Sequence, residues 1–159
     1  MVRPLRERPV DLFFVVVFSC FICTCILFDA LNALNVPISP TSPNALARLM
    51  YEHYAKDTDL LIIANPFWVQ LQLWVSAFLF APFYACAIYA LVKGRDWIHI
   101  PAIAFASAMT YSLVLYLGAQ FADPFVSPAP VKILAANLPY AIVSIAFAYR
   151  MRKAKNFSE

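Results

Sequence analysis

LFFVVVFSCFICTCILF, residues 12–28, contains no charged side chain and is the first of four such runs in this chain. The other three cover residues 60–92, 97–122 and 133–149. A helix rises about 1.5 Å per residue, so about 20 apolar residues cross the roughly 30 Å hydrocarbon core of a bilayer. The runs therefore predict an all-α membrane protein built as a bundle of four transmembrane helices.

The composition leaves no room for a separate water-soluble domain. Hydrophobic residues make up 63% of the 159 residues and charged residues 13%, whereas soluble domains are roughly half apolar and a quarter charged. A cleaved signal peptide is not expected, because the first run is longer than a usual signal core and no small-residue cleavage pattern follows it. We therefore expect a single transmembrane domain over residues 1–159.

The basic residues predict the orientation of the bundle. With four spans both termini share one side, and that side receives the Arg and Lys residues of segments 1–8, 93–95 and 150–155. The other side has only Arg48, Lys56 and Lys132. By the positive-inside rule the termini are cytoplasmic. The net charge of +3 is mostly this topology signal and needs no nucleic acid partner.

Prolines and apolar periodicity mark where the elements begin and end. The predicted spans are residues 10–35, 66–92, 97–121 and 131–150, with a lumenal loop over 36–65. Within that loop, apolar residues at helical spacing in 43–54 predict a short amphipathic helix lying over the lumenal mouth of the bundle. Pro82 and Pro139 fall inside spans, where kinks either open a cavity between the helices or only improve their packing.

Polar side chains recur along three of the spans. Trp68, Gln72 and Ser76 form one stripe; Ser107, Thr110 and Tyr111 share a face with Gly118; Asn137, Tyr140 and Ser144 form a third. These stripes predict a polar-walled interior, or else hydrogen bonds that only join the helices.

Asp29 is the sharpest candidate for function. It lies about 27 Å along the first helix from Asp11, in the lumenal leaflet. An ionised carboxylate there needs a cation, a donor network or water, which makes it a good seat for a cationic amine. The alternative is an interfacial acid turned toward lumenal water. Asp59, just before the second span, could reach backbone donors or the tyrosines at 51 and 54.

The cysteines give little sign of a cofactor. Cys20, Cys23, Cys25 and Cys86 all fall inside spans, where they behave as small apolar residues, and we expect no disulfide. Positions 23 and 25 face apart on a helix and no histidine accompanies them, so a metal site is not expected.

Several segments resemble the EXPERA-domain family in order and spacing. They are ILFD at 26–29, YAK at 54–56 followed by DLL at 59–61, Trp68, Pro82-Phe83, YALVKG at 89–94, WIHIPAI at 97–103 and Pro139-Tyr140. Within the family the sequence is more similar to the sigma-2 receptor branch than to the emopamil-binding protein branch of sterol isomerases.

The resemblance implies a four-helix protein of the endoplasmic reticulum membrane, or of endolysosomal membranes, that forms a homodimer and requires no cofactor. Its pocket would open sideways to lipid and hold a sterol or an amphipathic amine. Asp29 matches the acid that pairs with the ligand amine, and Asp59 matches a second acid that supports the pocket. Tyr140 and the neighbouring Asn137 match pocket walls, and Ser112, or Thr110 in a shifted register, matches a pocket hydroxyl.

One position departs from the sigma-2 receptor pattern. Ser76 stands where that branch has a glutamate beside the amine-binding acid, and Gln72, one turn earlier, is expected to substitute as a donor to Asp29. The predicted ligand-binding residues are therefore Asp29, Asp59, Gln72, Ser76, Thr110, Ser112, Asn137 and Tyr140.

Three functions remain open at this level. The favoured one is non-enzymatic binding of a sterol or amphipathic lipid. The second is an adaptor that holds other membrane proteins or precursors at the endoplasmic reticulum. The third is sterol isomerisation, which needs a proton donor and an acceptor in a dry pocket. It is disfavoured because isomerase members supply several intramembrane acids and a histidine where this chain offers Asp29 and Asp59.

Overall fold

The computed structural model describes residues 3–153 and 155–157, and every regular element in that part of the chain is helical. Labels α mark α-helices, and labels η mark short 3-10 or π-helical turns. In chain order the elements are η1 (Leu5–Glu7), α1 (Pro9–Thr24), η2 (Cys25–Asp29), α2 (Ala30–Ala33), α3 (Ala45–Met50), η3 (Tyr51–Ala55), α4 (Lys56–Thr58), α5 (Leu60–Ala64), α6 (Phe67–Val75), η4 (Ser76–Phe80), α7 (Ala81–Lys93), η5 (Asp96–Ile98), α8 (His99–Ala119) and α9 (Pro130–Arg150).

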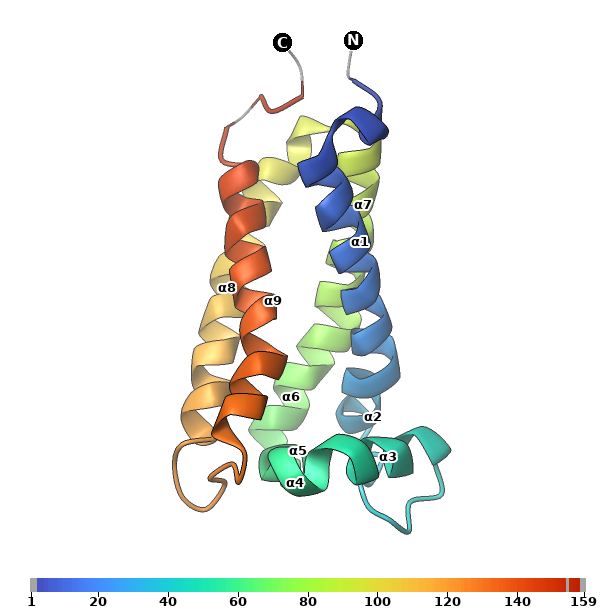
Figure 1. Ribbon diagram of the computed structural model, residues 1–159, viewed down its shortest axis with the longest axis vertical. Coiled ribbons are helices and arrows are strands. Elements are labelled where there is room, and N and C mark those ends of the chain that lie inside the picture. Colours follow the sequence, from blue (N-terminus) through green and yellow to red (C-terminus); the bar gives the residue numbers. More distant parts are fainter. Residues whose placement is uncertain (1–2, 154, 158–159) are drawn as a thin grey trace.

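Consecutive elements join into long helices that run side by side (Figure 1). Among the described residues, four are long and apolar enough to cross a membrane: Pro9–Ala33, Phe67–Lys93, Asp96–Ala119 and Pro130–Arg150. The predicted fold class, an all-α bundle of four transmembrane helices, is confirmed. Both ends of the chain lie at one end of the bundle, which we call the terminal end (Figure 1).

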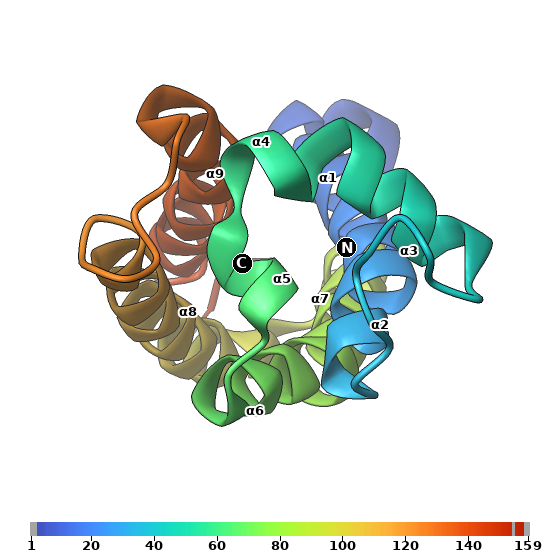
Figure 2. The same cartoon turned by 90° about the horizontal axis from the view of Figure 1, so that it is seen from below.

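The four spans associate as two pairs. In one pair α1 packs along α7, and in the other α8 packs along α9. The view along the bundle shows the four spans arranged around a central space, crossed at one end by the segment that connects the first span to the second (Figure 2). The side chains that fill or line this central space therefore decide what the bundle can hold.

Near the terminal end the central space is filled by aromatic rings. Phe18 of α1 lies 4.9 Å from Phe147 of α9 and 5.1 Å from Tyr84 of α7, measured between ring centroids. Phe105 of α8 contacts Tyr84 at 5.2 Å. Such tilted and edge-on pairs contribute about 0.5–1.5 kcal/mol each beyond the area they bury. These rings join the two helix pairs where the backbones do not approach closely.

A charged cluster closes the terminal end, and we call it the clasp (Arg8, Asp11, Arg150 and Phe157). Asp11 is 1% exposed, and its Oδ2 accepts hydrogen bonds from Arg8 Nη1 at 2.8 Å and Arg150 Nη2 at 3.2 Å. Arg8 also donates to the carbonyl of Leu91 at the end of α7. The clasp thus ties the start of α1 to the ends of α7 and α9.

At the opposite end the segment from α3 to α5 crosses the bundle, and we call it the strap (Figure 2). Asn44 begins it by accepting hydrogen bonds from the backbone N–H groups of Leu46 and Ala47. The predicted amphipathic helix is present: Ala47 and Met50 are buried, while Arg48 is exposed. The strap therefore covers one end of the central space.

Three π-helical turns interrupt the regular helices, at Cys25–Asp29, Tyr51–Ala55 and Ser76–Phe80. Pro82 follows the third, and a proline cannot donate the hydrogen bond that a regular helix needs at that place. A π-turn holds one extra residue and often marks a functional site. Pro139, by contrast, lies within α9 without such a turn. All three turns contribute residues to the cavity described next.

Candidate ligand-binding site

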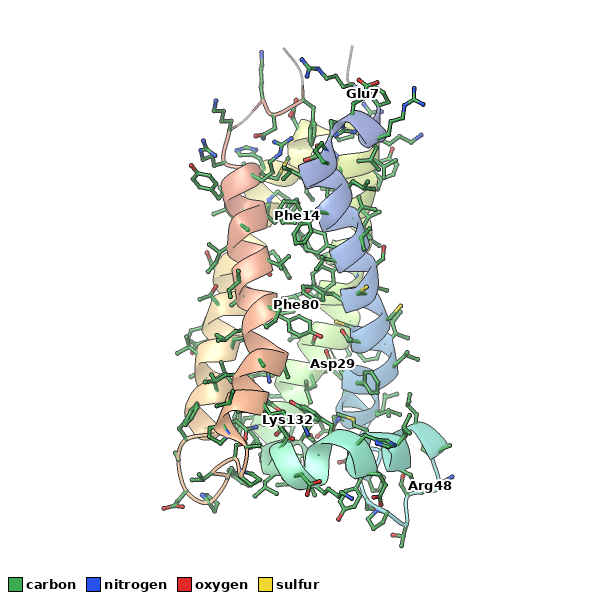
Figure 3. All side chains as sticks on the ribbon, viewed as in Figure 1. Glu7, Phe14, Asp29, Arg48, Phe80 and Lys132 are labelled. Carbon is green, nitrogen blue, oxygen red and sulfur yellow. The ribbon has the colours of Figure 1, made fainter. Side chains whose placement is uncertain are left out.

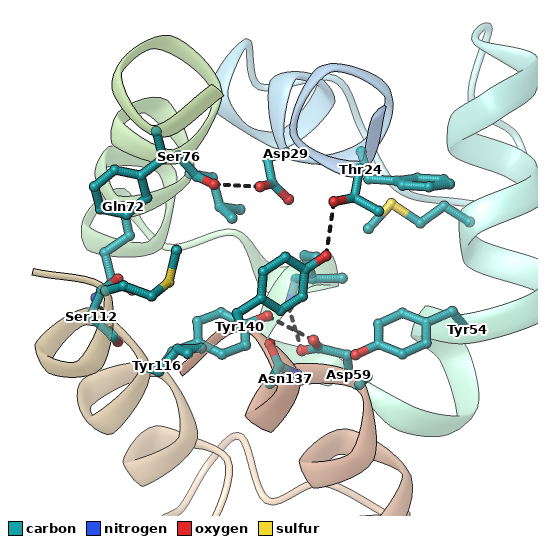
Figure 4. Close-up of a pocket in the computed structure, with 18 of the residues that line it drawn as sticks. Thr24, Asp29, Tyr54, Asp59, Gln72, Ser76, Ser112, Tyr116, Asn137 and Tyr140 are labelled. Carbon is teal, nitrogen blue, oxygen red and sulfur yellow. Dashed lines mark hydrogen bonds between the residues drawn. The ribbon is translucent and has the colours of Figure 1, made fainter. Parts of the chain in front are cut away.

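A cavity of about 570 Å³ lies inside the bundle between the aromatic core and the strap (Figures 3 and 4). Its lining comes from all four spans and the strap: Thr24, Phe28, Asp29, Leu49, Met50, His53, Tyr54, Asp59, Ile62, Gln72, Leu73, Ser76, Phe80, Met109, Ser112, Leu113, Tyr116, Ala136, Asn137 and Tyr140. Apolar and aromatic side chains make up much of this wall, with a few polar groups set among them. This is the usual construction of a small-molecule site, and the volume falls within the range of about 300–1,000 Å³ for such sites.

Asp29 is half-buried at the end of the first π-helical turn and faces the cavity. Its Oδ2 accepts a hydrogen bond of 2.6 Å from the Ser76 hydroxyl, which in turn lies 3.4 Å from the Cys25 sulfur. Among the described residues, no basic side chain forms an ion pair with Asp29. The carboxyl group therefore has only neutral hydrogen-bonding neighbours among the described residues, Ser76 and Cys25, and remains open to a donor from a ligand.

Gln72 does not take the role expected for it. Its amide nitrogen donates to the carbonyl of Ser112 at 3.2 Å, so it joins the second and third spans instead of supporting Asp29. The donor to Asp29 is Ser76, the first residue of the π-helical turn at Ser76–Phe80 (Figure 4). The expected substitution of Gln72 for the missing glutamate is thus wrong.

Asp59 is 1% exposed and lies between α4 and α5, outside the spans. Its carboxylate accepts hydrogen bonds from the Tyr116 hydroxyl at 2.7 Å, the Gln120 side-chain amide and the backbone N–H of Ile62 at 3.1 Å. Burial raises the pKa of Asp59 above its usual value, while these donors oppose the shift. Asp59 therefore holds the strap against α8 with both oxygens occupied.

The tyrosine near Asp59 was only partly anticipated. The sequence suggested Tyr51 or Tyr54; Tyr54 does interact with Asp59, and Tyr116 of α8 donates a further hydrogen bond to it. Tyr54 lines the cavity with its hydroxyl directed toward Asp59 (Figure 4). Burial and the neighbouring Asp59 charge raise the pKa of the Tyr54 hydroxyl, so it stays protonated.

Tyr140 forms the wall between the first and fourth spans. Its hydroxyl donates to the Thr24 hydroxyl at 2.8 Å, and its ring stacks on Phe21 with centroids 4.2 Å apart. Asn137, one turn earlier, lines the cavity while its amide nitrogen bonds to the carbonyl of Ile133 in its own helix. Both residues lie where the sequence placed them.

The third span presents a different face from the predicted one. Ser107, Tyr111 and Gly118 are exposed on the outside of the bundle. Thr110 does not line the cavity, and its hydroxyl donates to the carbonyl of Ala106 within α8. The predicted stripe of Ser107, Thr110 and Tyr111 is therefore wrong as a cavity wall.

Ser112, the alternative to Thr110, does line the cavity. With Tyr116 and Gln120 it forms a stripe at spacing i, i+4, i+8, and the last two residues hold Asp59. Sequence reasoning missed Tyr116, Gln120 and Thr24. The spacing of Ser112, Tyr116 and Gln120 was the signal that could have identified the inner face of this span.

Trp68, the first residue of the predicted stripe in the second span, does not line the cavity. Trp68 is exposed, whereas Gln72 and Ser76 line the cavity.

In the part of the chain that the structure describes, no group of three His, Cys, Asp or Glu residues could hold a metal ion. The polar groups that line the cavity are carboxyl, hydroxyl and amide groups together with the imidazole of His53.

One protein-family model matches a stretch of the chain that contains most of the cavity-lining residues. The model described as EBP, EXPERA (EXPanded EBP superfamily), matches residues 45–151, which is more than half of the chain. The match covers the strap and the last three spans, while Asp29 lies before its first residue. A search of curated proteins found no match.

Proposed function

The chain belongs to the EXPERA (EXPanded EBP superfamily) family, and from that premise we propose that it binds a sterol or similar amphipathic lipid without transforming it. The ligand occupies the cavity between the aromatic core and the strap. Asp29 anchors its polar end. The observation that carries this proposal is a carboxyl group that faces an apolar cavity and has no cationic partner among the described residues.

The shape and lining of the cavity support an amphipathic ligand. The lining combines apolar side chains such as Phe28, Leu73 and Phe80 with the carboxyl groups of Asp29 and Asp59. Burying a fused-ring or acyl body against the apolar part is favourable by about 25 cal/mol per Å² of apolar surface removed from water. A ligand with one polar end and an apolar body matches this division.

The state of the two carboxyl groups supports binding over catalysis. Moving a double bond in a sterol needs one group that gives a proton and another that accepts one. Asp29 is open to the cavity, but both oxygens of Asp59 are occupied by donors from the strap and α8. If Asp59 were the second group, it would have to abandon those bonds in each turnover.

The same proposal includes a cellular setting. We place the protein in the membrane of the endoplasmic reticulum with cytoplasmic termini, as the family resemblance and the distribution of Arg and Lys suggest. A homodimer is part of the same family expectation.

The test is binding of a photoreactive sterol and a radiolabelled hydrophobic amine to purified protein. Asp29→Asn keeps the shape of the side chain and removes its charge, so it should weaken amine binding at least tenfold, the loss of about 1.4 kcal/mol. Ser76→Glu should strengthen amine binding by adding a second carboxylate beside Asp29. Asp57→Asn is the matched control, because Asp57 is an exposed acid on the strap outside the cavity.

The results separate the proposal from its rivals. Saturable labelling that Asp29→Asn weakens and Asp57→Asn leaves intact supports an Asp29-anchored site. Absence of saturable binding in every variant contradicts the proposal. Conversion of a sterol by the wild-type protein, lost in Asp29→Asn, would replace the binding role with an isomerase.

A further inference from the structure

The terminal end carries an exposed ring of positive charge drawn from three separate chain segments. Among the residues that the structure describes, the exposed cations at this end are Arg3, Arg6, Lys93, Arg95, Arg152, Lys153 and Lys155. Glu7 is the exposed acid among them, and Asp96 is half-buried and bonded to the tail that follows α9. We call this set of seven side chains the cationic ring.

The chain after α9 folds back over the end of the bundle instead of extending away from it. Asp96 Oδ1 accepts hydrogen bonds from the backbone N–H groups of Asn156 at 2.6 Å and Phe157 at 2.9 Å. The Phe157 ring lies against the guanidinium groups of Arg8 and Arg150, 5.2 and 5.3 Å from its centroid. The tail is therefore attached at its far end, which keeps the cations between α9 and Phe157 close to the bundle.

The basic residues at this end differ in how strongly they already interact within the protein. Arg8 and Arg150 are committed to Asp11 in the clasp. Arg152 lies over the ring of Tyr149, 3.9 Å from its centroid, and donates to the carbonyl of the same residue. Tyr149 is itself 66% exposed near the end of α9, so Arg152 lies just beyond the fourth candidate span.

The strap end has a different charge balance. Its exposed cations are Arg48, Lys56 and Lys132, and its exposed acids are Glu52, Asp57 and Asp123. Lys56 and Glu52 also form an ion pair of 2.9 Å. Among the described residues, the two ends of one small bundle thus differ in exposed charge, and only the terminal end has a clear excess of one sign.

We propose that the cationic ring binds the headgroups of anionic phospholipids in the leaflet that surrounds the terminal end. Basic clusters next to a membrane span attract anionic lipid, and each Lys or Arg close to the surface adds to the attraction. The attraction decays within a Debye length, about 8 Å at physiological ionic strength, so the folded tail matters because it holds its cations within reach. This interaction is independent of the cavity and of the ligand proposed for it.

The experiment measures lipid selectivity in reconstituted phosphatidylcholine bilayers. Spin-labelled phosphatidylserine and phosphatidylcholine are added in turn, and electron paramagnetic resonance gives the fraction of each that is immobilised by the protein. We expect a preference for phosphatidylserine of about fivefold, the effect of one fully effective cation, which decreases as sodium chloride is raised.

Three variants identify the source of that preference. Replacing Arg152, Lys153 and Lys155 with Gln should reduce the preference by at least half. The matched control replaces Arg48, Lys56 and Lys132 with Gln at the strap end and should leave it unchanged. Phe157→Ala keeps every charge but releases the tail, and it should also lower the preference.

Each alternative outcome overturns the proposal. No preference in the wild-type protein, or equal losses in the tail variant and the control, would remove the cationic ring as a lipid site. An unchanged preference in Phe157→Ala would overturn the part of the proposal in which the folded tail holds its cations near the lipid surface. If inorganic phosphate abolishes the preference at an ionic strength where chloride does not, the ring is a pocket for free phosphate and not a membrane contact.

Discussion

Two acids on the first span, Asp11 and Asp29, have opposite surroundings. Asp11 is fully buried at the terminal end and is held by the guanidinium groups of Arg8 and Arg150. Asp29 faces the cavity and has the neutral Ser76 and Cys25 side chains as hydrogen-bonding neighbours. The protein supplies the countercharge at one end of the helix and leaves it out at the other. The difference indicates that Asp11 serves the fold, whereas Asp29 is left open to the cavity, as the proposed ligand anchor would be.

The strongest test of this contrast is the removal of the Asp11 charge. Asp11→Asn leaves two arginines close together without their shared acid, and breaking a buried ion pair in this way costs roughly 3–5 kcal/mol. We expect a large fall in the melting temperature of the detergent-purified protein, followed by tryptophan fluorescence. Asp57→Asn serves as the control, since Asp57 is exposed and forms no ion pair among the described residues. Equal melting temperatures for the two variants would remove the clasp as a stabilising element.

Asp59 sharpens the comparison. It is buried and forms no ion pair among the described residues, yet both of its carboxylate oxygens accept hydrogen bonds. Replacing it with Asn places an amide group against the Tyr116 and Gln120 donors, which should cost about 1–3 kcal/mol at neutral pH.

The pH dependence of the same variant has a definite sign. The pKa of Asp59 is raised in the folded protein, so its folded form takes up a proton more readily than its unfolded form. Its contribution to stability is fully present below the ordinary value of 3.8 and is lost as pH rises through the folded value. Wild type should therefore gain stability relative to Asp59→Asn as pH falls from 7 toward 4. Parallel melting curves across that range would mean that Asp59 does not titrate with folding.

The smallest effect on stability is expected at Asp29. A carboxylate in an apolar cavity without a cation costs free energy in the absence of a ligand. Asp29→Asn should therefore leave the ligand-free protein as stable as wild type or more stable, by about 1 kcal/mol, even as ligand binding weakens. Melting temperatures measured with and without the hydrophobic amine test this. A large loss of stability in the ligand-free variant would place Asp29 with Asp11 as a structural acid.

The number of spans could be predicted from the sequence because each span is a long run without charge. The candidate acids could be found for the same reason, since an acid inside such a run is conspicuous. The inner face of the third span could not be read in this way. Ser107 and Thr110 bond to carbonyl groups of their own helix, so a hydroxyl on the outer face costs little and its presence does not mark the inside.

The donor to Asp29 was assigned to Gln72 instead of Ser76 for a related reason. Periodicity assumes 3.6 residues per turn, and a π-helical turn adds a residue that changes the direction of every side chain after it. One such turn is Cys25–Asp29, which ends at Asp29 itself and so changes the direction of this side chain relative to the second span. In the structure the neighbour of Asp29 is Ser76, while Gln72 donates to Ser112.

The pairing of the spans has a consequence for how the protein is made. A ribosome releases the chain from its amino terminus, so the first three spans enter the membrane before the fourth is synthesised. Asn137 and Tyr140 belong to that fourth span, and Tyr140 reaches back to Thr24 in the first. The cavity wall is thus incomplete until the fourth span has been inserted. Under the proposed function, a ligand can be enclosed only after that step.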